Sequence, residues 1–117
     1  MPTPDDADFA RLRALVEAPD DAAVLRAYAL TLGDQATGDG WLARARRSLE
    51  RKLADLRPRL CGHAATRAIL SDDGADVQTI ASVLLVAALE HGERLDAAIA
   101  IAAAAARLGL RRYCAGA

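Results

Sequence analysis

The side chains best suited to chemistry in this sequence are two histidines, His63 and His91, and two cysteines, Cys61 and Cys114. Thiolate and imidazole groups are the usual zinc ligands, so these four residues suggest a Cys2His2 site. The spacing argues against it, because a single residue separates Cys61 from His63 and nothing brings the other two close. We therefore predict no metal ion and no cofactor. Both cysteines are expected to be reduced, with Cys61 buried and Cys114 packed as a small apolar side chain.

A second pattern links Arg57 and His63, which have five residues between them in the segment RPRLCGH. This segment resembles the Arg-x4–6-His signature of HEPN ribonucleases, a family of small all-helical proteins. The resemblance implies that Arg57 and His63 would activate a ribose hydroxyl and stabilise phosphate charge. Pro58 departs from the family pattern, which usually has a polar residue there. The favoured alternative is that His63 is solvated or caps a helix, so we predict no catalytic residues.

The basic residues are concentrated in one segment of the chain. Residues 40–67 carry eight basic and two acidic side chains, whereas residues 1–39 and 68–106 each have a net charge of −5. A basic helix can neutralise phosphates, but this one has no interleaved aromatic residues. Pairing with the acidic segments, within one chain or between copies, is favoured, and nucleic-acid binding is the alternative. The predicted basic face consists of Arg44, Arg46, Arg47, Arg51 and Lys52.

The hydrophobic pattern is helical along the whole chain, and no run alternates as a strand would. Apolar stripes predict helices near residues 9–18, 20–32, 41–57, 59–70, 77–91 and 94–108. Pro58 either kinks the third helix or opens a separate one, so five or six helices are expected. The predicted fold is an all-α bundle without a sheet, forming a single domain over residues 1–117. Residues 1–5 and 115–117 are expected to be frayed.

The composition, 53 % hydrophobic but only 3 % aromatic, predicts a core of alanine, leucine, isoleucine and valine. Small side chains let helices approach closely, so stability should come from many close contacts. The N-terminal MPTPDDADF has neither a basic region nor an apolar run, which indicates no signal peptide and a cytoplasmic location. No membrane span is expected either, because it needs about 20 apolar residues and Asp96 and Arg107 interrupt the richest run.

The segment DAAIAIAAAAARLGL, residues 96–110, predicts a helix with apolar residues on every side. Such a helix must be buried on every side, and the helix before it is similar. Because two such helices are hard to hide in one small domain, we predict that another chain covers one face. The predicted apolar interface consists of Ile80, Leu84, Leu95, Ile99, Ile101 and Leu108.

Residues 60–114 combine an LCG segment, a hydrophobic helix, a short acidic turn, an Ala/Ile helix and a GLRRYC ending. This combination resembles small helical modules of actinobacterial proteins that accompany the effectors of bacterial conflict or immune systems and act as adaptors. The resemblance implies protein–protein association, a role in antiviral defence and no catalytic residues. The sequence thus favours a non-enzymatic module that associates with itself or with another protein. The alternatives are a nucleic-acid-binding subunit and a HEPN-like ribonuclease.

Overall fold

The computed structural model describes residues 3–72 and 74–115. In these residues it contains seven helices and no strand, which confirms the all-α class and exceeds the expected number of helices by one. Of the residues expected to be frayed, 1–2 and 116–117 lie outside the described part. The helices are α1 (Asp6–Glu17), α2 (Ala22–Thr31), α3 (Trp41–Gly62), α4 (Ala64–Leu70), α5 (Val77–Glu90), α6 (Leu95–Leu108) and α7 (Leu110–Cys114).

The first helix begins at a defined cap rather than in a frayed end. The Asp5 side chain accepts a hydrogen bond from the backbone N–H of Asp8, and the Asp8 side chain accepts one from the backbone N–H of Asp5, each at 2.9 Å. This capping box satisfies two backbone donors at the helix start. Its hydrogen bond to the helix holds the pKa of the Asp5 carboxyl below its usual value. Residue 5 therefore acts as the N-cap of α1.

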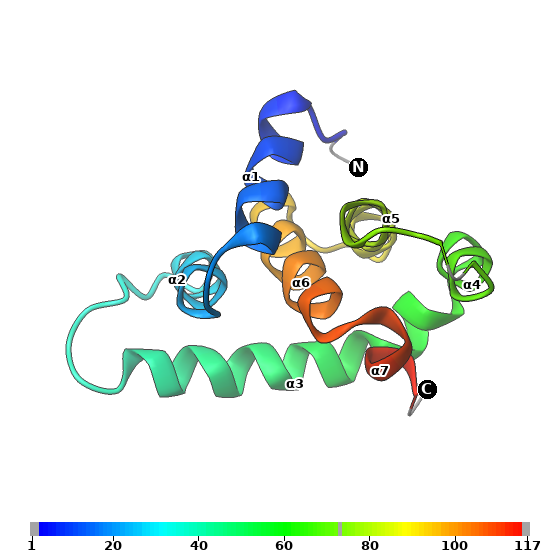
Figure 1. The fold of residues 1–117 in the computed structure, drawn as a ribbon. Coiled ribbons are helices and arrows are strands. Elements are labelled where there is room, and N and C mark those ends of the chain that lie inside the picture. The colour runs from blue at the N-terminus through cyan, green and yellow to red at the C-terminus, as the bar shows by residue number, and fades with distance from the viewer. Residues whose placement is uncertain (1–2, 73, 116–117) are drawn as a thin grey trace.

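Helix α6 lies at the centre of the molecule, and α1, α2, α3, α5 and α7 pack around it (Figure 1). Ile99 and Ile101 point in different directions from its axis, and their side chains are only 1 % and 0 % exposed. The alanines between them allow the surrounding helices to approach closely. Both faces of α6 are thus covered within one chain, so Ile99 and Ile101 are not available to a second chain.

Helix α3 continues through Pro58 to Gly62 instead of ending before the proline. Pro58 and Ala54 both face solvent, so water can bond the Ala54 carbonyl that lacks its usual N–H partner. The following helix, α4, begins at His63, whose Nδ1 accepts a hydrogen bond from the backbone N–H of Ala65 at 3.2 Å. The predicted helix over residues 59–70 is therefore divided between the end of α3 and α4.

The sequence did not predict α7, which follows a break at Gly109. The φ of Gly109 is +94°, a conformation that favours glycine. It ends α6 and turns the chain so that Leu110 and Tyr113 are buried against the core. The Tyr113 hydroxyl donates a 2.6 Å hydrogen bond to the Leu53 carbonyl of α3. Burial raises the pKa of Tyr113 to about 12, so this hydroxyl keeps its proton at neutral pH.

Cys61 and Cys114 form a disulfide that joins the end of α3 to α7, with 5.7 Å between their Cα atoms. The prediction of reduced cysteines is therefore wrong. Because Tyr113 is anchored in the core, the neighbouring Cys114 lies beside Cys61. The two cysteines are 53 residues apart in the sequence, so the sequence alone does not indicate that they meet. Because disulfides persist mainly in oxidising compartments, the expectation of a cytoplasmic location loses the support that reduced thiols gave it.

A substitution in α6 tests whether its core is complete within one chain. Ile101→Ala should lower the free energy of unfolding by about 2–5 kcal/mol, because it leaves a cavity in a fully buried site. Leu30→Ala, at a residue that is 60 % exposed, is the control and should change stability by less than about 0.5 kcal/mol. Urea unfolding measures both at a low and a high protein concentration. Equal effects of the two substitutions would contradict the placement of Ile101.

Candidate functional site

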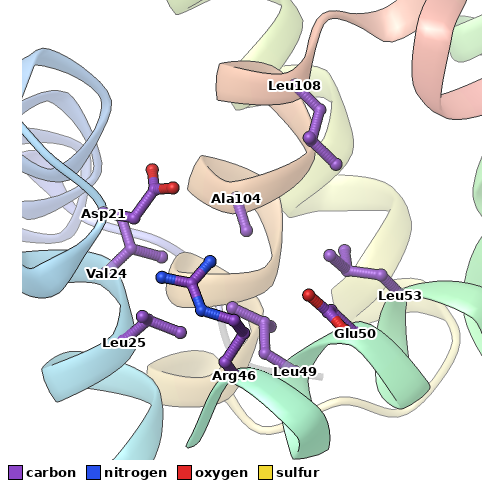
Figure 2. Close-up of a pocket in the computed structure, with 9 residues that line it drawn as sticks. All are labelled: Asp21, Val24, Leu25, Arg46, Leu49, Glu50, Leu53, Ala104 and Leu108. Atoms are coloured by element: carbon purple, nitrogen blue, oxygen red, sulfur yellow. The ribbon is translucent and has the colours of Figure 1, made fainter. Parts of the chain in front are cut away.

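A groove opens between α2 and α3, with α6 as its floor (Figure 2). Its volume is about 100 Å³, and its walls and floor are mostly apolar. The groove exists because Ala104 of α6 is too short to fill the space between the two helices above it. Leu108 lies at one end of the groove and is 45 % exposed, so apolar surface continues from the groove to solvent. The apolar lining consists of Val24, Leu25, Leu49, Leu53, Ala104 and Leu108.

Two charged side chains, Arg46 and Glu50, stand at the α3 edge of the groove, one helical turn apart. Both are exposed, and neither forms an ion pair or side-chain hydrogen bond within the described ranges. In Figure 2 the guanidinium of Arg46 reaches across the apolar lining towards α2. The stem of an arginine can cover apolar surface in this way while its charged end stays hydrated. The groove therefore has an apolar floor and one unpaired charge of each sign at its edge.

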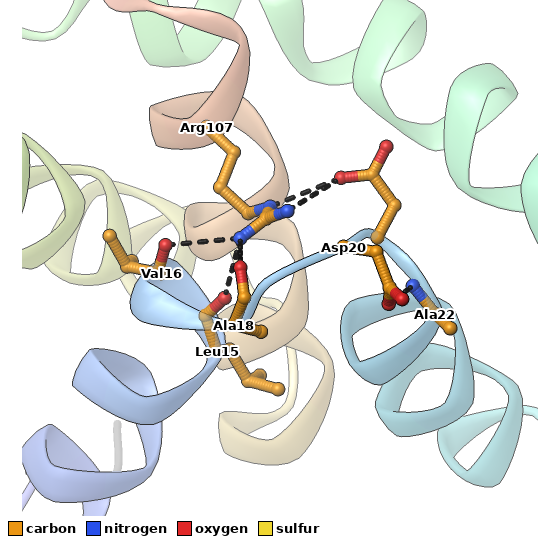
Figure 3. A network of polar contacts seen from close by, with 7 residues as sticks. Leu15, Val16, Ala18, Asp20, Ala22 and Arg107 are labelled. Atoms are coloured by element: carbon orange, nitrogen blue, oxygen red, sulfur yellow. Dashed lines mark hydrogen bonds and ion pairs between the residues drawn. The ribbon is translucent and has the colours of Figure 1, made fainter.

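The opposite edge of the groove, at the start of α2, is fixed by Arg107 of α6. Its Nε donates to the Asp21 carboxylate at 3.1 Å, and the two side chains form an ion pair at 3.0 Å. Its Nη1 donates to the carbonyls of Leu15, Val16 and Ala18 at 3.3, 3.1 and 2.7 Å (Figure 3). These carbonyls lie at the end of α1, where the Leu15 carbonyl has only a 3.4 Å hydrogen bond from the backbone N–H of Ala18 and few helical N–H groups remain. Arg107 thus holds the connection between α1 and α2 against α6.

Two of the five residues of the predicted basic face form ion pairs within the chain. Arg44 forms an ion pair with Asp34 at 3.3 Å, and Lys52 forms one with Glu93 at 3.1 Å. Arg47 and Arg51 are exposed on the outer side of α3 and have no such partner in the described part of the chain. Together with Arg46 at the groove, three of the five predicted basic residues remain open to a partner.

The six residues of the predicted apolar interface differ in how far they are exposed. Leu84, Ile99 and Ile101 are buried in the core and are not available to a partner, whereas Ile80 and Leu95 are half-buried. Leu108 is the member of this set that is exposed beside the groove. The groove cannot be singled out from the sequence, because Val24, Leu25, Leu49 and Leu53 have the spacing of ordinary core positions and are themselves buried.

Arg57 and His63, the pair that resembles the ribonuclease signature, both have structural roles. The Arg57 Nε donates to the Tyr113 carbonyl at 2.8 Å, and its guanidinium lies 5.3 Å from the centre of the Tyr113 ring. His63 caps α4 through Nδ1, which confirms the favoured alternative for this residue. Its Nε2 therefore carries the proton and donates to the Glu90 carboxylate. Both side chains therefore contact other parts of the same chain.

The proposed zinc ligands are not brought together. Cys61 and Cys114 are bonded to each other, and His63 is held by Glu90. Over residues 3–72 and 74–115 there is no group of three or more histidine, cysteine, aspartate or glutamate side chains placed to hold a metal ion.

Comparison with known proteins assigns no family to the chain: no family model matches it, and no curated protein or solved structure matches it significantly. None of the helices described has the length and apolar character that crossing a membrane requires.

The role of Arg107 predicts a clear effect of a conservative substitution. Arg107→Lys keeps the charge but loses the planar fork that bonds several acceptors at once. It should lower the free energy of unfolding by about 1–3 kcal/mol. Arg47→Lys, at an exposed residue without a partner, is the matched control and should be neutral. Urea unfolding compares the two, and a loss no larger than that of the control would show that Arg107 does not hold the α1–α2 connection.

Proposed function

We propose that this protein is a non-enzymatic self-assembly module whose copies associate through the groove between α2 and α3. The observation that carries the proposal is the combination of an open apolar groove with Arg46 and Glu50, which have no charged partners of their own. An apolar recess with a charged edge is typical of protein interfaces, which have an apolar centre and a polar rim.

A second copy is the occupant that best matches this charge pattern. When two copies of α3 lie antiparallel across a two-fold axis that passes midway between Arg46 and Glu50, Arg46 of each copy faces Glu50 of the other. Two-fold interfaces require this kind of self-complementarity, because the same surface contributes both sides. The exposed Leu108 then supplies an apolar side chain that each copy can bury against the other.

The surface around the groove is suitable for close approach of another helix. Ala43 and Ala54 lie exposed on α3 on either side of the charged pair, and their short side chains do not obstruct a neighbour. A stable interface buries roughly 800 Å² on each partner. The described chain has 6456 Å² of accessible surface, so such an interface needs about an eighth of it.

The resemblance of residues 60–114 to adaptor modules of bacterial conflict systems supports the same class of function, association with protein. We propose on this basis that self-assembly serves a defence system. The structural roles of Arg57 and His63 make a ribonuclease the weaker candidate.

Reversal of the two charges tests the proposal. Arg46→Glu or Glu50→Arg alone turns two attractive pairs across the axis into two repulsive ones, so either should weaken self-association by about 2 kcal/mol, roughly thirtyfold in Kd. The double variant restores the opposite charges and should return the Kd close to that of the unmodified protein. Sedimentation velocity over a range of protein concentrations measures these constants.

Arg59→Glu provides the matched control, since it makes the same charge change at an exposed residue of α3 on the side of the helix away from Arg46 and Glu50. A monomer at all concentrations would refute the proposal. So would a double variant that associates no better than the single ones, or an Arg59→Glu variant as weak as Arg46→Glu.

A further inference from the structure

A surface cavity of about 240 Å³ opens beside the disulfide, where α3 gives way to α4. It is lined by Pro58, Cys61, Gly62 and Arg67, and Cys114 is not among the lining residues. Gly62 leaves the cavity open, because a Cβ added there would meet no atom within 4 Å. Cys61 is thus the residue of the disulfide that lines a space large enough for a small molecule, although it is only 6 % exposed and Cys114 is half-buried.

Arg67 is the charged residue of this cavity. Its side chain is exposed and makes no ion pair or hydrogen bond in the described part of the chain. The other lining residues carry no charge, so the charge that lines the cavity is the positive charge of Arg67. A positive charge at this place favours the binding of an anionic molecule and also stabilises a thiolate close to it.

From this arrangement we infer that Cys61 is a thiol–disulfide exchange site for small anionic thiols. The incoming thiolate attacks the Sγ of Cys61 and forms a new S–S bond with it. The bond between Cys61 and Cys114 breaks, and its electron pair leaves on the Cys114 sulfur, which takes a proton from water. A second thiolate then attacks the incoming sulfur, which releases Cys61 as a thiolate and forms the disulfide of the small thiol. Two thiols are oxidised and the protein disulfide is reduced, so the electrons balance.

Exchange at Cys61 would release the covalent hold on α7. The helix would then depend on its remaining contacts, namely the Tyr113 hydroxyl on Leu53, Arg57 on the Tyr113 carbonyl, and the buried Leu110. These contacts are enough to keep α7 near its place but not to lock it. The site therefore couples the presence of a small thiol to the mobility of the C-terminal helix.

The test compares two small thiols of opposite charge, glutathione and cysteamine, at equal concentrations of thiolate. The protein is treated briefly under native conditions, quenched with acid and mapped by mass spectrometry. The first adduct is expected on Cys61, and glutathione is expected to react faster than cysteamine. Arg67→Glu should lower the ratio of the two rates at least threefold, because it replaces attraction of the anion with repulsion. Arg47→Glu, with the same charge change on the outer side of α3, should leave the ratio unchanged.

Three results would overturn the inference: a first adduct on Cys114, no adduct on Cys61 in the native protein, or equal rate ratios in the Arg67→Glu and Arg47→Glu variants. Because Arg67 is exposed, its substitution should leave the fold intact, and circular dichroism of each variant checks this. The double variant Cys61→Ser/Cys114→Ser provides a second measurement. Its α7 should be cleaved by trypsin after Arg111 or Arg112 as fast as in the thiol-treated protein, and faster than in the untreated one. Cleavage at the untreated rate would mean that the disulfide does not hold α7.

Discussion

The arrangement of this protein depends on one constraint, the burial of an alanine-rich helix on all sides. Helix α6 has little side-chain volume, so the helices around it must come close to exclude water. This close approach supplies contacts that a core with few aromatic residues would otherwise lack. The short alanine side chains of α6 also leave space wherever one of them lies under a gap between two covering helices. The groove above Ala104 is such a space, so the feature that completes the core also creates the candidate interface.

Polar contacts fix the covering helices at both edges of this core. Arg107 extends from the end of α6 and bonds the carbonyl groups that end α1, which sets the position of α2. At the far end of α3, Tyr113, Arg57 and the disulfide hold α7 in place. The groove therefore lies between helices that are fixed independently of any partner, and a preformed surface of this kind loses little freedom on binding.

The sequence predicted the parts of the structure that depend on local pattern. The helical class, most helix positions and the apolar character of α6 follow from residue spacing. It did not predict features that depend on distant residues meeting: the disulfide, α7 and the bonds of Arg107. The predicted interface failed at Ile99 and Ile101 because periodicity shows that a face is apolar but not which chain covers it. For the same reason the groove residues were indistinguishable from core residues.

The most direct measurement of the central claim is the solution mass of an Ala104→Leu variant. Ala104 forms the floor of the groove, so a leucine there should fill the groove and remove the site for a second copy without a loss of stability. The variant should be a monomer in sedimentation velocity at concentrations where the unmodified protein associates, and its free energy of unfolding should be undiminished. The control, Ala68→Leu on the exposed side of α4, should associate normally. An Ala104→Leu variant that associates as strongly as the unmodified protein would contradict the account.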